Sequence, residues 1–182
     1  MYGRLPRFRL SERGHLQAQQ TARFLASRPV TAIYTSPLLR ARQTAEVLSQ
    51  YHPSAPVRSS RALLEVRTSY QGSPNSILQP GFSFYEPPKE PGDETMQEVF
   101  ERLVRFLRRA ASRHRGGTVV AVTHADPIAI MRVGLDRLPM TASSLHSTVY
   151  PARSSVTQLT LGPDRPLAVA YFNVAGVQEL KL

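Results

Sequence analysis

The sequence predicts an α/β protein, a three-layer α/β/α sandwich in which a mostly parallel sheet carries helices on both faces. Segments with helical periodicity alternate with short β-branched segments along most of the chain. One of these, TVVAVT at 118–123, is continuously apolar, which is typical of a strand buried on both faces. The 182 residues are 41% hydrophobic, enough for one domain with a core. We therefore expect a single domain over residues 1–182, with a loop-rich insert at about 51–92.

The chain is expected to open with a helix, a strand and a second helix. Ser11 is an N-cap candidate, and small or apolar residues recur at helical spacing through 11–28. The segment TAIYT at 31–35 is short and β-rich, so it predicts a strand. The Ser-Pro pair at 36–37 is typical of a helix start, and 38–50 continues that helix. Its buried face is predicted to consist of Leu38, Ala41, Ala45 and Leu48.

The segment from 51 to 92 contains seven prolines and shows no clear periodicity. Loops of this length are unusual in a compact domain and often cover a functional site. A long helix follows at about 93–114 and ends at Gly116 and Gly117. Its buried stripe is predicted to be Val99, Leu103, Phe106, Leu107 and Ala110.

After the apolar strand, a further helix is expected over about 127–136. The segments SVTQLTL at 155–161 and LAVAYFN at 167–173 alternate like half-buried strands. The sequence GPDRP between them is typical of a turn. These strands complete the predicted sheet.

His124 lies where the hydrophobic pattern of the apolar strand stops. In open α/β sheets, ligands bind beyond the carboxyl ends of the strands. The next helix begins near Asp126 and Pro127, so its free N–H groups point to the same place and favour an anion. His124 is therefore a candidate for anion chemistry. The alternative is a structural histidine whose hydrogen bonds only stabilise the loop, with Asp126 as a helix cap.

Arg40 stands in the first turn of the helix after the 31–35 strand. That position is unfavourable for a cation, because the helix dipole is positive there. Its presence indicates a bound anion that the guanidinium clamps with two hydrogen bonds. The alternative is an ordinary solvated arginine, which is how we interpret Arg42.

Four segments together resemble the histidine phosphatase superfamily, the phosphoglycerate mutase-like proteins, from about Gly3 to the C-terminal strands. TSPLLRARQTA matches that family's Ser-Pro-x-x-Arg-Ala-x-x-Thr-Ala signature, and VVAVTHADPI resembles its strand ending in Ser/Thr-His-Gly. RALLEVRTSYQG resembles the segment with the family's acidic residue, here Glu65. GRLPRFRLSERGHLQA resembles the Leu-Ser/Thr-x-x-Gly-x-x-Gln-Ala segment.

The resemblance implies a phosphoglycerate mutase-like fold and a role for each matched residue. His124 would bind the phosphoryl group and stabilise the transition state, and Arg40 would clamp the same group. Glu65 would protonate the leaving oxygen, and the backbone N–H of Ala125 would face the phosphate. Cationic donors suit phosphoryl transfer because they neutralise its equatorial oxygens.

A general acid such as Glu65 is worth roughly 10²–10⁴ in rate. The alternative for Glu65 is a surface carboxylate that pairs with Arg61 or Arg67.

The family's nucleophile is a histidine in an Arg-His-Gly motif at the end of its first strand, and the sequence contains no such motif. We therefore expect a chain that is N-terminally incomplete relative to the family, with the first strand absent. The alternative is a non-catalytic relative that binds phosphate-bearing ligands. No substitute nucleophile is expected, because no buried strand precedes the remaining histidines, His15, His52, His114 and His146.

The function expected from the resemblance is a phosphatase that hydrolyses small phosphate monoesters. A mutase is disfavoured, because the basic residues of the 66–92 stretch are only Arg67 and Lys89. No cofactor or metal is expected, since there is no cysteine and the five histidines lack metal-ligand spacing. No signal peptide and no run of about 18 apolar residues is present, so we expect a soluble cytoplasmic protein without a membrane partner. Monomer and homo-oligomer both stay open.

The formal net charge is +10, and 21 of the 23 basic residues are arginine once Lys89 and Lys181 are subtracted. A basic surface can indicate nucleic acid, acidic lipid or a phosphorylated small molecule. The basic helix segment 101–115 would be the nucleic-acid candidate. It has no interleaved exposed aromatic residue and no known binding motif, so we interpret it as a solvated face and do not expect nucleic acid.

Overall fold

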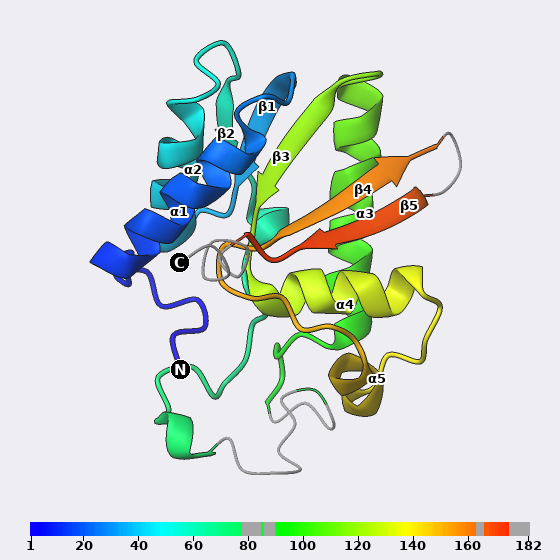
Figure 1. The fold of residues 1–182 in the computed structure, drawn as a ribbon. Helices are drawn as coiled ribbons and strands as arrows, with labels where there is room; N and C mark the ends of the chain where they lie inside the picture. Colours follow the sequence, from blue (N-terminus) through cyan, green and yellow to red (C-terminus); the bar gives the residue numbers. More distant parts are fainter. Residues whose placement is uncertain (78–84, 86–89, 163–165, 175–182) are drawn as a thin grey trace.

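The computed structural model describes residues 1–77, 85, 90–162 and 166–174 (Figure 1). Its helices and strands alternate as predicted through most of the chain. In chain order the elements are α1 (Glu12–Leu25), β1 (Val30–Thr35), α2 (Leu39–Ser49), β2 (Val57–Ser59), α3 (Met96–Arg113), β3 (Thr118–Val122), α4 (Ala125–Leu135), α5 (Ala142–Ser147), β4 (Val156–Leu161) and β5 (Pro166–Phe172). Single 3-10 turns lie at Arg61–Leu63 and Asn75–Ile77.

The central sheet is parallel and has the strand order β2-β1-β3. Successive residues of β1 point to opposite faces, as the two-residue period of a strand requires. Ile33 packs in a core with α1 and α2, whereas Ala32 and Tyr34 pack in a second core with α3 and α4. Helices therefore cover both faces of the sheet, which confirms the predicted fold class (Figure 1).

Parallel pairing brings the carboxyl ends of β1 and β3 to the same edge of the sheet. The backbone N–H of Ser36, just after β1, donates to the carbonyl of Val122, the last residue of β3, at 2.9 Å. The helices that follow these strands, α2 and α4, therefore begin close to one another. This junction positions the candidate site.

The capping predictions are confirmed for α1 but adjusted for two other helices. Ser11 accepts a hydrogen bond from the N–H of Gly14, as an N-cap should. The long helix begins at Met96 rather than near 93, because Thr95 and Glu98 form a reciprocal capping box. The second helix begins at Leu39, and Ser36 is not its cap.

The sequence interpretation of β3 as a strand buried on both faces is wrong. Thr118 and Ala121 are exposed and the three valines are half-buried. In the described residues β3 pairs with β1 alone, so its other edge has no strand neighbour there. An apolar composition shows what a strand can bury, but the neighbouring elements decide what it does bury.

Two further differences concern strands. β2 was missed inside the predicted loop-rich stretch, because three exposed residues just after Pro56 carry no alternation signal. β4 and β5 form the predicted antiparallel pair, yet they make a separate two-stranded sheet. The predicted GPDRP turn lies partly outside the described residues.

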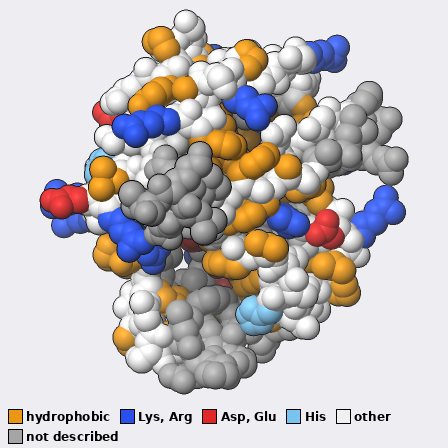
Figure 2. Space-filling view, in the orientation of Figure 1, with side chains coloured by type: hydrophobic (Ala, Val, Ile, Leu, Met, Phe, Trp, Pro, Cys, Tyr) orange, Lys and Arg blue, Asp and Glu red, His pale blue; other side chains and the backbone are white. Residues whose placement is uncertain are grey.

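On the face shown in Figure 2, the basic side chains form separate patches, without a continuous stripe. Arg102, which the sequence placed on the basic face of the long helix, instead packs inward with 12% of its side chain exposed. No helix in the described part of the chain is long and apolar enough to cross a membrane.

Candidate active site

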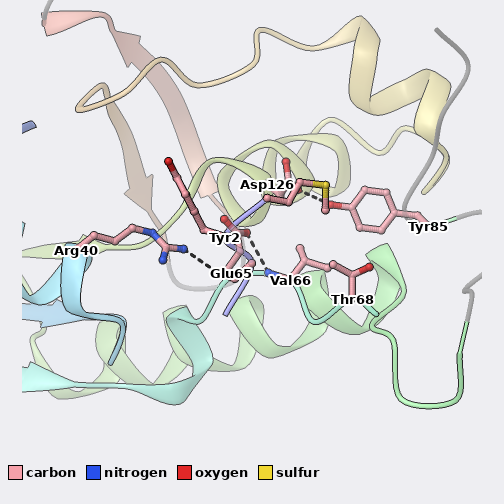
Figure 3. Close-up of a pocket in the computed structure, with 9 residues that line it drawn as sticks. Tyr2, Arg40, Glu65, Val66, Thr68, Tyr85 and Asp126 are labelled. Atoms are coloured by element: carbon pink, nitrogen blue, oxygen red, sulfur yellow. Dashed lines mark hydrogen bonds between the residues drawn. The ribbon is translucent and has the colours of Figure 1, made fainter. Parts of the chain in front are cut away.

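A small pocket of about 220 Å³ lies at the carboxyl ends of the central strands. Arg40 comes from the start of α2, Glu65 from the loop after β2, and Asp126 from the start of α4 (Figure 3). The described residues that line it are Met1, Tyr2, Gly3, Arg40, Glu65, Val66, Thr68, Tyr85 and Asp126. Ligands of open α/β sheets bind at this place.

Arg40 presents part of its guanidinium group without a protein partner. Its Nη2 donates to the carbonyl of Gly3 at 2.9 Å and lies 3.3 Å from Nδ1 of His124. Its Nη1 is buried and has no hydrogen-bond partner among the described residues. Burial lowers the pKa of Arg40, although Glu65 nearby opposes the shift. A buried cationic donor without a partner is costly, and an anion would satisfy it.

His124 is the N-cap residue of α4 and is 8% exposed. Its Nε2 lies 2.8 Å from the hydroxyl of Ser36, and its Nδ1 lies 3.9 Å from Oε2 of Glu65. Since Arg40 can only donate, Nδ1 acts as the acceptor and the ring proton resides on Nε2, facing Ser36. Burial, and then the positive charge of Arg40, lowers the pKa of His124 to about 3. The imidazole is therefore neutral at pH 7.

Glu65 has the opposite shift. Burial first, and then the negative charge of Asp126, raises the pKa of Glu65 to about 8. The hydrogen bond from the N–H of Val66 to Oε1, at 3.0 Å, opposes this shift only in part. Glu65 therefore carries a proton at pH 7 and is suited to act as an acid.

The backbone of Glu65 is held from behind by two arginines. The carbonyl of Glu65 accepts from Nε of Arg4 at 2.7 Å and from Nη2 of Arg102 at 3.3 Å. Glu94 bridges the two cations, at 2.7 Å from Arg4 and 3.0 Å from Arg102. No ion pair joins the Glu65 side chain to Arg61 or Arg67 in the described residues. The surface-pair alternative for Glu65 is thus not what the structure shows.

Arg40 and Glu65 line the pocket, whereas His124 does not line it but lies within 4 Å of both. Ala125 follows as the first residue of α4. The backbone N–H groups at this helix start have no carbonyl of their own helix to bond. Such groups, together with the helix dipole, favour an anion. The sequence-predicted set therefore shares one location.

Four neighbours were missed or misjudged from the sequence. Ser36 is fully buried and orients His124, whereas its Ser-Pro context indicated a helix cap. Asp126 is not the cap of α4, since His124 occupies that position. The Asp126 carboxylate instead accepts hydrogen bonds from the hydroxyls of Tyr85, at 2.9 Å, and Tyr150. Both tyrosines come from loops, and no local sequence pattern predicts their contact with Asp126.

No group of three or more potential metal ligands occurs in the part of the chain that the structure describes.

The parallel sheet with helices on both faces, and the pocket at its strand ends, define an α/β protein with a ligand site at the edge of an open sheet. The chain matches the histidine phosphatase superfamily (branch 1) over residues 1–174, and it belongs to that family.

Relatives agree with this assignment. The uncharacterized protein Rv0525 of Mycobacterium tuberculosis is 29% identical over 187 residues, covering 97% of this chain and 90% of that protein. Phosphoserine phosphatase 1 of Hydrogenobacter thermophilus is 28% identical over 134 residues, covering 69% of this chain and 64% of that protein. The structure of the mycobacterial glucosyl-3-phosphoglycerate phosphatase Rv2419c superposes with a TM-score of 0.73 at 27% identity, covering 87% of this chain and 81% of that one.

Proposed function

We propose that the protein is a phosphatase that hydrolyses small phosphate monoesters through a phosphohistidine. One observation carries the proposal: a buried guanidinium nitrogen without a partner lies beside a carboxyl group that keeps its proton. Cleavage of a phosphate ester requires both a cation for the phosphoryl oxygens and an acid for the leaving oxygen. The names of two relatives, both phosphatases, support the same reaction.

In this proposal the phosphate binds between Arg40 and the start of α4. Arg40 donates to one of its oxygens through Nη1, which has no partner among the described residues, and the N–H of Ala125 donates to another. His124 is neutral before the ligand arrives. The dianion raises the pKa of His124, so the imidazole becomes a charged donor where negative charge accumulates.

The reaction then follows in two steps. A histidine nitrogen attacks phosphorus, the bond to the leaving oxygen breaks, and Glu65 transfers its proton to that oxygen. Water next attacks the phosphohistidine and gives a proton to the Glu65 carboxylate, inorganic phosphate leaves, and both the histidine and the protonated Glu65 are restored. The pocket volume of about 220 Å³ suits a phosphate with a short organic group.

The histidine that accepts the phosphoryl group is, in this proposal, none of the five in residues 1–182. His124 is the one that lies beside Arg40 and Glu65, and it already has the transition-state role. The others are spread over the fold: His15 lies in α1, His52 follows α2, His114 bonds the hydroxyl of Tyr34, and His146 lies in α5.

The second candidate is a non-catalytic relative that binds phosphate-bearing ligands. The spread of the histidines favours this candidate, because it leaves no nucleophile beside Arg40 and Glu65 among the described residues. Phosphate binding needs no nucleophile and could use Arg40 and the N–H of Ala125 alone.

The test uses the protein isolated from the cells that make it, incubated with a short-chain alkyl phosphate. A phosphatase releases inorganic phosphate and yields a phosphohistidine detectable by mass spectrometry under non-acidic conditions. Arg40→Ala should lower kcat/KM at least about 100-fold. Arg42→Ala, with an exposed side chain two residues away, is the matched control. Ligand binding without phosphate release or phosphohistidine would establish the second candidate and overturn the first.

A further inference from the structure

The pocket has two electrically different ends. Arg40 reaches it from one side, Asp126 and Tyr85 from the other, and Glu65 lies between them (Figure 3). Because Glu65 is protonated at pH 7, it adds no charge to the middle. A ligand in this pocket therefore meets a guanidinium at one end and a carboxylate at the other.

The carboxylate of Asp126 is held by two tyrosine hydroxyls and has no counter-ion among the described residues. Tyr85 and Tyr150 each donate to a different oxygen of Asp126. No cationic group of the described residues lies within 4 Å of it, although the chain contains 21 arginines. Glu94, by contrast, is paired with two arginines. Asp126 is thus a half-buried negative charge at a ligand pocket, positioned by neutral donors.

Such a carboxylate works against a simple phosphate ester. It lies near enough to Glu65 to contribute to the raised pKa of that residue, so its field reaches the proposed phosphate position. A dianionic phosphate with an uncharged alkyl group would be repelled by it. A ligand with a cation beyond the ester oxygen would turn that repulsion into attraction.

The geometry of the far end suits an ammonium group in particular. Each carboxylate oxygen has two acceptor positions, and each tyrosine uses only one of them. An ammonium group has three N–H donors and could reach the remaining positions on the carboxylate. Tyr2 and Tyr85 add aromatic surface to the lining, which suits the short carbon chain between the two charges.

We propose that Asp126, held by Tyr85 and Tyr150, is a specificity-determining residue that selects phosphate monoesters of short amino alcohols. The phosphate end of this ligand rests on the proposed function. The ammonium end rests on Asp126 alone.

The test is a comparison of three probes by isothermal titration calorimetry at pH 7: inorganic phosphate, propyl phosphate and 2-aminoethyl phosphate. The two esters have the same number of heavy atoms after phosphorus and differ in a methyl or an ammonium terminus. The wild-type protein should bind 2-aminoethyl phosphate at least about tenfold more tightly than propyl phosphate, as a charge-assisted hydrogen bond predicts.

Asp126→Asn removes the negative charge at the far end of the pocket. The preference for 2-aminoethyl phosphate should disappear, whereas propyl phosphate and inorganic phosphate should bind more tightly because a like charge is gone. Asp136→Asn, an exposed C-cap residue of the same helix, makes the same change of net charge and should keep the preference. Asp126→Ser replaces the asparagine variant if that protein does not fold.

The outcomes separate the two proposals. If phosphate and propyl phosphate bind but 2-aminoethyl phosphate binds no better than propyl phosphate, the amino-alcohol inference is overturned and the phosphate site stands. If none of the three probes binds, the phosphate site itself is wrong and the inference falls with it. A preference that persists in Asp126→Asn would also overturn the inference.

Discussion

Glu65 and His124 are within 4 Å of one another, yet burial shifts their pKa values in opposite directions. Burial disfavours the charged form of any group, so an acid keeps its proton and a base loses one. At pH 7 both side chains are consequently neutral. With Glu65 and His124 both neutral, the Arg40 guanidinium is the positive charge that attracts an incoming phosphate.

Glu65→Gln should remove a pH dependence of stability. The folded-state pKa of about 8 exceeds the unfolded value of 4.5, so the folded state binds more protons between these values. The stabilisation is complete below pH 4.5 and is lost as the pH rises through 8. Between pH 5 and 9, urea unfolding of the wild type should show a loss on the order of 2–4 kcal/mol beyond that of the variant.

The control for this comparison is Glu46→Gln, an exposed carboxyl in α2. It should follow the wild-type pH curve. Parallel curves for Glu65→Gln and the wild type would show that Glu65 ionises normally in the folded protein.

His124 should fail to titrate between pH 5 and 8 in the ligand-free protein. Its pKa is lowered from 6.5 to about 3, so its stabilising contribution is present above pH 6.5 and is lost as the pH falls toward 3. Two-dimensional NMR of the imidazole should report a neutral ring with the proton on Nε2. Saturating phosphate should move its midpoint upward. A midpoint near 6.5 without ligand would contradict the buried, arginine-facing position of the ring.

At the scale of elements, α4 and α3 pack closely around one glycine. A Cβ added to Gly134 would come within 2.2 Å of the ring of Phe100 in α3. That distance cannot be absorbed without moving the ring or the helix, and α4 carries both His124 and Asp126 at its start.

Gly134→Ala should therefore destabilise the protein by about 1–3 kcal/mol, even though alanine favours helix formation. Thermal unfolding measures the effect. Combining it with Phe100→Ala makes room for the new methyl group, so the double variant should lose less than the sum of the single losses. Strict additivity would show that the two residues are not in contact.

A second link between elements is the cluster of Arg4, Glu94 and Arg102. Glu94 joins the N-terminal segment to the start of α3, and both arginines hold the Glu65 backbone. Glu94→Ala would leave two partly buried cations without their carboxylate. We expect a loss of about 3 kcal/mol in urea unfolding. Glu101→Ala removes an exposed pair with Arg105 and should cost about 0–1 kcal/mol, so equal losses would refute the special role of Glu94.

For the molecule as a whole, the helices and the main strands could be predicted because periodicity and caps are local signals. The exposure of β3 could not be predicted from the sequence, because it depends on which strands lie beside β3. Arg40 and His124 were predicted from their places just after two strands, and Glu65 was predicted from the resemblance to the histidine phosphatase superfamily. Ser36 and the Tyr85–Asp126 contact were not found, because they arise only when distant loops meet.

The most direct test of the whole account is the binding of inorganic phosphate at pH 7, measured by calorimetry on the wild type, Arg40→Ala and Arg42→Ala. The central claim is that the free Nη1 of Arg40 marks a phosphate site. We expect wild type and Arg42→Ala to bind phosphate alike, and Arg40→Ala to bind at least about tenfold more weakly. Equal binding by all three proteins would contradict the account.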